Sequence, residues 1–390
     1  MSLLRGTSVP QTALYEPLTF QRGLPMKNRF MLAPMTNQQS GEDGVLSSDE
    51  LHWLRMRAQG GFAHIVTCAC HVEERGKGFP GELGIFSDRH VLGLRYVADV
   101  LRANNCRSSV QLYHGGLRAI AADRISPSGH EASGARAMTR TDIEELIEAF
   151  VAAAVRAETA GFDGVELHAA HGYLISQFLS AQFNQRCDEF GDSAQGRSRL
   201  LFRIIDGIRA AVGSEFQLGV RLSPERFGQD LVEIRAVVQR LIEECTVDFI
   251  DLSLWDAFKQ PEDPRYAGRS LLSYFTEIDR GPVRLGVAGK IIEPSSANAC
   301  IAAGVDFVTL GKVAVLHHDY PKRLQVDDAF QPDWLPVRTE RLRREGLGER
   351  FIAYLATWTN FVCDYPVAND APRFDIGEYL TTGTSGKKVQ

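Results

Sequence analysis

The chain of 390 residues is long enough for one large barrel or two ordinary domains, and its 44% hydrophobic residues are typical of a protein with a sizeable core. A net charge of -6 without a basic cluster argues against a nucleic-acid surface, and no apolar stretch is long enough to predict a membrane span. Seven cysteines at irregular spacings predict no disulfide framework, and residues 1–12 lack the apolar core of a signal peptide, so we expect a reducing, cytoplasmic location.

Short apolar segments alternate with amphipathic helical segments between residues 14 and 325. The apolar segments predict strands at 29–33, 62–67, 108–112, 162–167, 216–222, 247–252, 283–287 and 305–310. The helical segments lie at 48–59, 87–101, 141–160, 197–212, 234–242 and from 294 onward. Eight such units predict parallel strands with helical crossovers and match a closed (β/α)₈ TIM barrel. An open, doubly wound sheet is the alternative, which the regularity of the units disfavours.

The flanking segments have a different character. Residues 1–13 predict a flexible N-terminus, and residues 381–390 predict a disordered tail. Residues 326–380 predict an extension that packs on the barrel or on a neighbouring subunit. Within this extension, residues 349–362 carry an aromatic and aliphatic stripe that predicts one helix. Inside the barrel, the segment 117–140 predicts a long loop of the kind that is often functional.

The most informative segment surrounds the fourth predicted strand. Thr141 and Glu144 form a capping-box pattern at the start of a helix, and Gly161 suits the left-handed position at its end. The strand that follows ends in His168, His171 and Tyr173. Because chemistry in parallel α/β proteins collects at the C-terminal ends of the strands, these three side chains are candidate site residues.

Other predicted strands also end in polar residues or glycines. Thr36, Gln111 and Arg221 stand near three of these ends. Strands seven and eight end in Ala288-Gly289 and Gly311-Lys312. Glycines let backbone N–H groups approach an anion and lysine adds a positive charge, so this pair of turns predicts a phosphate site. Ordinary turns beside a solvated lysine are the simpler interpretation.

Several motifs together resemble one known family. They are residues 24–36 (LPMKNRFMLAPMT), 111–116 (QLYHGG), 161–174 (GFDGVELHAAHGYL), 177–180 (QFLS), 184–191 (NQRCDEFG) and 219–224 (GVRLSP). In this order they resemble the old yellow enzyme family of FMN-dependent ene-reductases, over about residues 14 to 325. The resemblance implies a barrel with non-covalent FMN that takes hydride from NADPH or NADH and reduces activated C=C bonds of small-molecule alkenes such as enones, maleimides or nitro compounds.

The resemblance also implies roles for individual residues. His168 and His171 would bind the substrate's carbonyl or nitro oxygen, Tyr173 would donate a proton, and Tyr113 would face the substrate. Arg221 would place a positive charge near flavin N1. The remaining FMN contacts would come from residues beside the ring or around the phosphate, namely Pro34, Met35, Thr36, Cys68, Gln111, Ala288, Gly289, Gly311 and Lys312.

The sequence departs from the family pattern in several places. Lys312 stands where the family usually has arginine, and lysine lacks the bidentate geometry of a guanidinium group. Asp192 stands where a second glycine is expected after Gly191, and the position of Tyr113 varies among relatives, which leaves the substrate open. The loop 71–83 is longer than in shorter relatives. The four-cysteine iron–sulfur pattern of the dienoyl-CoA reductase branch is absent from the sequence.

Alternative interpretations remain at this stage. His168 and His171 could be core histidines, or metal ligands of a barrel hydrolase, although no third ligand is tied to them by sequence. Cys68 and Cys70 are interpreted as reduced packing residues, and no metal site is predicted. Arg221 could be a structural ion-pair partner. Within the family, a flavin-linked dehydrogenase of another donor or a flavoprotein carrier without turnover is also compatible, and association into homo-oligomers is left open.

Overall fold

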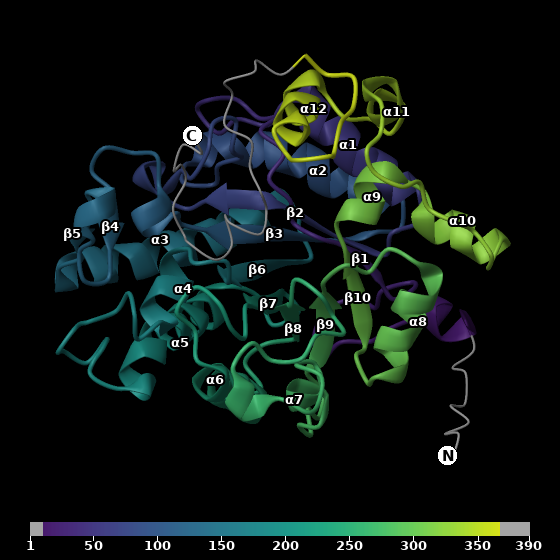
Figure 1. The fold of residues 1–390 in the computed structure, drawn as a ribbon. Helices are drawn as coiled ribbons and strands as arrows, with labels where there is room; N and C mark the ends of the chain where they lie inside the picture. The colour runs from purple at the N-terminus through teal and green to yellow at the C-terminus, as the bar shows by residue number, and fades with distance from the viewer. Residues whose placement is uncertain (1–10, 367–390) are drawn as a thin grey trace.

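Eight parallel strands close into a barrel in the computed structural model, which describes residues 11–366 (Figure 1). Neighbouring strands follow the order β1-β10-β9-β8-β7-β6-β3-β2, so each pairs with the strands of the adjacent units and none is left at an edge. The strands are β1 (Phe30–Leu32), β2 (His64–His71), β3 (Arg107–Tyr113), β6 (Gly164–Ala169), β7 (Gln217–Leu222), β8 (Phe249–Ser253), β9 (Arg284–Ala288) and β10 (Phe307–Leu310). The predicted closed barrel is confirmed, and the open sheet is excluded.

Helices surround this barrel (Figure 1). They are α1 (Ser48–Gln59), α2 (Val91–Ala103), α3 (Arg140–Ala160), α4 (Leu174–Leu179), α5 (Ala194–Ala211), α6 (Leu231–Glu244), α7 (Ser273–Thr276), α8 (Pro294–Ala302), α9 (Lys312–Leu316), α10 (Tyr320–Val326), α11 (Thr339–Arg344) and α12 (Glu349–Ala356). Short 3₁₀ helices lie at η1 (Gln11–Tyr15), η2 (Glu74–Gly76), η3 (Asp88–His90), η4 (Gly116–Arg118), η5 (Glu131–Ser133) and η6 (Pro264–Tyr266). None of the helices in the described residues is both long and apolar enough to span a membrane.

The barrel interior is filled by large side chains that need glycine partners. A Cβ atom on Gly219 would lie 2.1 Å from the ring of Phe249, and one on Gly286 would lie 2.0 Å from the ring of Phe307. The two phenylalanines are fully buried and form an edge-to-face pair with ring centroids 5.9 Å apart. The two rings fill the barrel near the N-terminal ends of β8 and β10. The polar residues nearer the C-terminal ends of the strands therefore lie over a packed interior.

The N-cap of helix α3 lies two residues earlier than the sequence pattern indicated. Thr139, not Thr141, is the N-cap: its hydroxyl accepts from the backbone N–H of Asp142, and Asp142, not Glu144, returns the bond to the backbone N–H of Thr139. Asp142 also forms paired hydrogen bonds with Arg136, which holds the pKa of that carboxyl below its usual range. Gly161 ends the helix at φ 91°, as predicted.

Two peripheral segments also differ from expectation. The predicted loop at 117–140 contains a small sheet of β4 (Ile125–Ser126) and β5 (Arg136–Ala137). The predicted helix at 349–362 ends at Ala356, because the Thr357 hydroxyl bonds the carbonyl of Tyr354 and the chain turns back so that Val362 pairs with Val337.

The extension packs on the barrel helices α1 and α9 (Figure 1). The buried guanidinium group of Arg57 donates to the carbonyls of Ala314 and Glu345 and lies over the ring of Trp53, which in turn packs edge-to-face on Phe351. Residues 11–13 belong to η1, although residues 1–13 were predicted to be flexible. The predicted tail at 381–390 lies outside the described residues.

Candidate active site

Strand β6 and the turn after it bring His168, His171 and Tyr173 together. His171 and Gly172 have left-handed backbones, with φ values of 60° and 70°, which fold the chain back over the strand end. The ring centroids of His168 and His171 are 4.9 Å apart, and those of His168 and Tyr173 are 5.2 Å apart. The three residues predicted from the sequence therefore form one cluster at the C-terminal end of the barrel.

Hydrogen bonds within the chain engage three of the four ring nitrogens of this histidine pair. His171 Nδ1 lies 3.2 Å from His168 Nε2, and His171 Nε2 lies 2.7 Å from the hydroxyl oxygen of Ser253. The backbone N–H of His171 donates to Ser223. His168 Nδ1 is buried and has no hydrogen-bond partner among the described residues.

Both histidines are neutral. Burial lowers the pKa of His168 and of His171 well below the usual value, and the positive charges of Arg221 and Arg118 lower both further. For His168, the neighbouring His171 adds to the effect. Each ring therefore carries a single N–H group, which limits how many hydrogen bonds the pair can donate.

Aromatic and cationic groups surround Tyr173. The ring of Tyr113, which is fully buried, lies 4.6 Å from that of Tyr173 and 5.9 Å from that of His168, measured between centroids. The guanidinium carbon of Arg118 lies 4.7 Å from the centroid of the Tyr173 ring, and Arg118 donates to the carbonyl of His171. Arg118 thus fixes both the turn and the tyrosine.

Below the histidines, one arginine lies between two buried carboxyl groups. The strand register places Arg221 opposite His168 on one side and opposite Asp251 on the other, and Arg221 Nε lies 3.2 Å from Asp251 Oδ2. Gln111 donates to Glu166 across 2.7 Å, and Thr309 donates to Asp251 across 2.9 Å. Arg221 is therefore an ion-pair partner, so its positive charge is partly compensated inside the protein.

The two carboxyl groups hold fewer than two negative charges. Burial, and then the charge of Asp251, raises the pKa of Glu166 to about 8. Burial also raises the pKa of Asp251, although Arg221 and Thr309 act in the opposite direction. Both carboxyl groups therefore hold a proton more readily than exposed carboxyl groups do.

The residues predicted to bind phosphate form a cradle that fits an anion. Gly289 has φ 157°, and a Cβ there would lie 2.8 Å from the backbone nitrogen of Ala257 and 3.0 Å from that of Asp256. Desolvation lowers the pKa of Lys312, and the charge of Lys290 lowers it further, so two cations repel each other at this point. Lys290 Nζ lies 3.5 Å from Asp256, which compensates part of this repulsion. A phosphate group near Lys312 would relieve the rest, so the two lysines fit the phosphate of FMN.

The other predicted cofactor residues differ from one another in burial and in their contacts. Pro34, Met35 and Thr36 follow β1 and are half-buried, and a Cβ on Gly311 would lie 3.4 Å from the sulfur of Met35. The carbonyl of Ala288 accepts from the backbone of the β8 loop. Cys68 is buried against Glu50, so only its backbone could contact the cofactor, and burial raises the pKa of its thiol well above the usual value.

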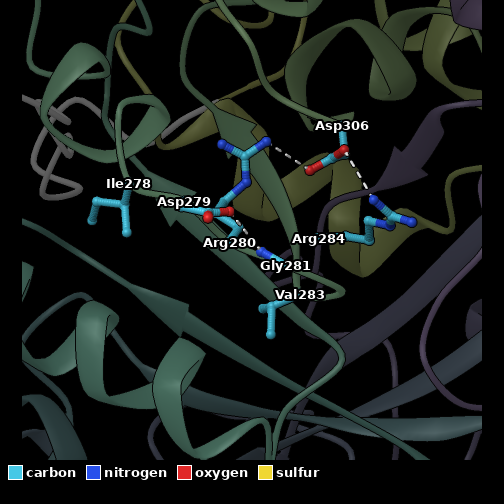
Figure 2. A pocket seen from close by; sticks show the side chains of 7 residues that line it. All are labelled: Ile278, Asp279, Arg280, Gly281, Val283, Arg284 and Asp306. Atoms are coloured by element: carbon cyan, nitrogen blue, oxygen red, sulfur yellow. Dashed lines mark hydrogen bonds and ion pairs between the residues drawn. The ribbon is translucent and has the colours of Figure 1, made fainter.

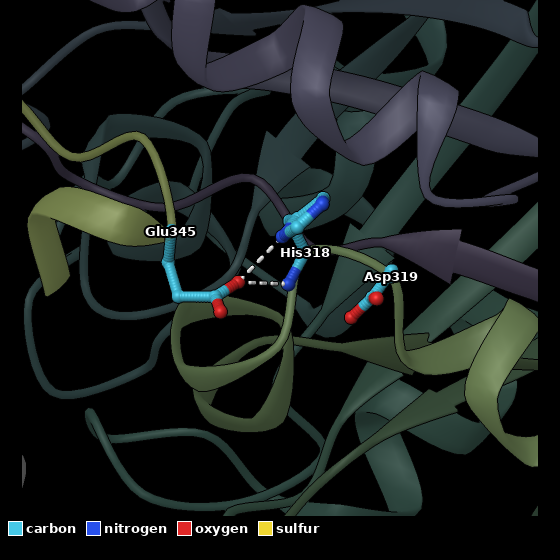
Figure 3. A group of neighbouring side chains, drawn as sticks. All are labelled: His318, Asp319 and Glu345. Carbon is cyan, nitrogen blue, oxygen red and sulfur yellow. Dashed lines mark hydrogen bonds and ion pairs between the residues drawn. The ribbon is translucent and has the colours of Figure 1, made fainter. Parts of the chain in front are cut away.

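The metal-site alternative finds no support at the histidine pair. Among the described residues, the group whose ligand atoms could hold a metal is His318, Asp319 and Glu345, far along the chain from this site (Figure 3). Its carboxylates are already paired: His318 Nδ1 lies 2.7 Å from Glu345, and Arg323 donates to Asp319 across 2.7 Å. This group ties the extension to the barrel.

Sequence reasoning missed four residues that shape the site. Ser253 lies one residue beyond the predicted end of its strand, at 252, and was not considered as a strand-end residue. Asp251 is a charged residue in a mostly apolar strand, which is a signal that could have been used. Lys290 directly follows Gly289, which was predicted to lie at the phosphate. Arg118 lies in the long loop and had no usable signal.

Comparison with known proteins identifies the family of this chain. The model of the NADH:flavin oxidoreductase / NADH oxidase family matches residues 13–329. The chain is 33% identical over 314 residues to "Probable NADH-dependent flavin oxidoreductase YqiG" of Bacillus subtilis, covering 77% of this chain and 84% of that protein. It is 29% identical over 330 residues to "Probable flavin mononucleotide-dependent alkene reductase" of Leishmania infantum, covering 77% and 87%.

A solved structure supports the same fold. A complex of 2-naphthoyl-CoA reductase with 2-naphthoyl-CoA superposes with a TM-score of 0.74 at 26% identity. The match covers 81% of this chain and 52% of the other, so this chain spans about half the length of that protein.

Proposed function

Because the chain belongs to the NADH:flavin oxidoreductase / NADH oxidase family of FMN-dependent old yellow enzyme type, we propose that it reduces the C=C bond of activated alkenes with hydride from NADPH or NADH. The observation that carries this proposal is the cluster of His168, His171 and Tyr173 beside Arg221. The similarity to a protein named as an alkene reductase supports it.

In this proposal, the side chains of the site have different roles in the reaction. Bound FMN supplies hydride transfer between NAD(P)H and the alkene. The histidine pair binds the oxygen of the activating carbonyl or nitro group, where negative charge grows as the alkene accepts hydride. Tyr173 protonates the neighbouring carbon, since a tyrosine hydroxyl keeps its proton at neutral pH. Tyr113 forms the wall of the substrate site.

The cofactor residues are proposed from the same geometry. Gly289, Gly311 and Lys312, with Lys290, hold the phosphate. Residues 34–36, the backbone at Cys68, and Ala288 lie along the ring, Gln111 meets its pyrimidine edge, and Arg221 faces N1. The link to FMN is non-covalent. The enzyme is proposed to be cytoplasmic, which its free cysteines fit.

The test is spectroscopic. The purified protein should be yellow, bleach on anaerobic addition of NADPH or NADH, and regain its colour on addition of cyclohexenone with formation of cyclohexanone. A protein that is reoxidised by oxygen but by no enone, maleimide or nitroalkene would refute the alkene-reductase proposal. A colourless protein that does not bind FMN would refute the flavin assignment as well.

The phosphate cradle has its own test. Lys312→Ala should fold normally but lose most of its bound FMN, because the cation facing the phosphate is gone. The matched control is Lys322→Ala, which removes a lysine on α10 and should retain the flavin. Equal FMN affinity in wild type and Lys312→Ala would show that the phosphate lies elsewhere.

A further inference from the structure

The short helix α9 has the proposed phosphate lysine at one end and contacts with the extension at the other. Lys312 is its first residue, and the helix ends four residues later at Leu316. The backbone N–H groups of Ala314 and Val315 donate to the carbonyl of Gly311 and close its first turn. A helix this short has little stability of its own, so contacts at its far end help to fix the position of Lys312.

One of these contacts comes from Arg57 on α1, whose side chain is fully buried. Arg57 Nε and Nη2 both donate to the carbonyl of Ala314, at 3.2 and 3.0 Å. Arg57 Nη1 donates across 2.6 Å to the carbonyl of Glu345, which is the C-cap of α11. Carbonyls in the last turn of a helix lack intrahelical partners, and a cation beside them is favourable. Arg57 therefore ties α9 to the end of α11.

A second contact comes from the extension itself. Arg341 on α11 donates from Nη2 to the carbonyl of Leu316 across 2.7 Å, and the same nitrogen lies 2.9 Å from His317 Nδ1. The carboxylate of Glu345 accepts from the backbone N–H of His318, and His318 Nδ1 lies 2.7 Å from it (Figure 3). The last carbonyl of α9 and the turn that follows are thus held by side chains of the extension.

We propose that the extension takes part in FMN binding, with Arg57 and Arg341 as positioning residues that hold α9 so that Lys312 faces the phosphate. The proposal rests on the proposed function for the identity of that anion. Helix α11 lies beyond residue 329, where the match to the family ends, so family membership assigns it no role. Lysine is a point charge without the bidentate fork of arginine, so its contact with phosphate depends closely on where its backbone stands.

The test compares FMN with riboflavin, which has the same ring system but no phosphate. Arg341→Met should raise the dissociation constant of FMN about 2- to 30-fold, the range for a residue that acts on a site without contacting the ligand. The dissociation constant of riboflavin should stay unchanged, because Lys312 has no phosphate to bind. Titration of the flavin-free full chain, followed by flavin fluorescence, measures both constants.

The matched control is Arg343→Met. Arg343 stands on the same helix but pairs with Glu349 at the surface, so both affinities should stay as in wild type. Arg57→Met should show the same selective loss of FMN as Arg341→Met. Because removal of the fully buried Arg57 can prevent folding, the decisive variant is Arg341→Met, whose side chain is 25% exposed.

A double-mutant cycle identifies the group on which Arg341 acts. In the Lys312→Ala background, Arg341→Met should weaken FMN binding no further, because the cation that it positions is gone. If riboflavin binds too weakly to be measured, this cycle decides alone.

The outcomes separate this inference from the proposed function. Equal weakening of FMN and riboflavin, unchanged FMN affinity in Arg341→Met, or the same weakening with and without Lys312 would overturn the positioning role and leave the phosphate at Lys312. If Lys312→Ala alone keeps the wild-type affinity for FMN, the phosphate assignment of the proposed function is wrong, and the positioning role is overturned with it.

Discussion

The two ends of the barrel use buried charge in opposite ways. At the N-terminal end, Asp248 is fully buried but accepts from Arg22, from Arg209 and from the backbone N–H of Leu218. At the C-terminal end, Glu166 and Asp251 are equally buried, yet Glu166 Oε2 and Asp251 Oδ2 have no hydrogen bond of good geometry among the described residues. The first arrangement holds strands together, whereas in the second Asp251 Oδ2 has only the ion pair with Arg221 and Glu166 Oε2 has no hydrogen bond.

The N-terminal end also has a pocket, but the carboxylate of Asp306 in it is paired within the protein. Figure 2 shows Asp306 between Arg280 and Arg284, at distances of 3.1 and 3.7 Å, and the backbone N–H of Leu285 also donates to Asp306. The pocket is lined by Ile278, Asp279, Arg280, Gly281, Val283, Arg284 and Asp306. This pocket is therefore weak evidence for a binding site. The Asp306 carboxylate that lines it already has partners within the protein.

The largest expected effect belongs to the C-terminal end. Tyr173→Phe should slow cyclohexenone reduction by about 10²- to 10⁴-fold, the usual contribution of a general acid. Flavin reduction by NADPH and reoxidation by a quinone should be unchanged, since neither needs this proton. Stopped-flow measurement of the three reactions provides the check.

Tyr113→Phe is the matched control, because it removes a hydroxyl from the same ring cluster and leaves Tyr173 in place. It should slow cyclohexenone reduction much less. Equal loss in all three reactions of Tyr173→Phe would indicate structural damage, and no loss in any would make water or another residue the proton donor.

The N-terminal end should respond in stability. Asp248→Ala leaves Arg22 and Arg209 without their shared carboxylate and should lower the free energy of unfolding by about 3–5 kcal/mol. Urea denaturation measures this loss, and the folded variant should keep the wild-type flavin reduction potential. Asp279→Ala at the same end, where the side chain is exposed, should change stability by no more than about 0.5 kcal/mol. If Asp248→Ala were as stable as wild type but had an altered flavin reduction potential, the proposed difference between the two ends of the barrel would be wrong.

Arg221→Met tests the positive charge that we propose to face flavin N1. Loss of the cation should lower the flavin reduction potential and slow reduction by NADPH by about 10²- to 10³-fold, as for removal of one preorganised group that stabilises developing charge. Asp251→Asn should act in the opposite direction on the potential, because it removes the carboxylate that compensates Arg221. An unchanged potential in FMN-loaded Arg221→Met would rule out this electrostatic role.

The sequence predicted the barrel because each unit carries its own local signal. Apolar strand segments, amphipathic helical stripes and the helix end at Gly161 are all determined by residues close in sequence. The order of the elements and the cluster at residues 168–173 could therefore be predicted. Element ends were less predictable. The cap at Thr139 depends on the reach of Arg136 to Asp142, and the end of α12 depends on a pairing between Val337 and Val362.

Contacts between strands could not be predicted from the sequence alone. The partner of Arg221 is 30 residues away on the next strand, and its distance of 3.2 Å follows from the register of β7 with β8. Likewise, Ser253 reaches His171 across 82 residues, so the engagement of the second histidine within the chain had no local signal. Sequence patterns located the residue types, and the barrel register determined which of them act on each other.

A further expected effect concerns the pH dependence of stability at the C-terminal end. Burial raises the pKa of Glu166 to about 8 from an ordinary value of 4.5. Between those values the folded protein keeps a proton that the unfolded chain releases, so this group makes stability fall as pH rises, by at most about 1.4 kcal/mol per pH unit. Glu166→Gln cannot titrate, and its stability should vary less between pH 5 and 8 in urea denaturation. Glu144→Gln is the matched control: its surface pair with Arg203 lowers the pKa of Glu144, so folded and unfolded states are both ionised in this window and the slope should stay as in wild type. If the Glu166→Gln slope equals the wild-type slope, Glu166 is ionised in the folded protein and burial does not raise its pKa.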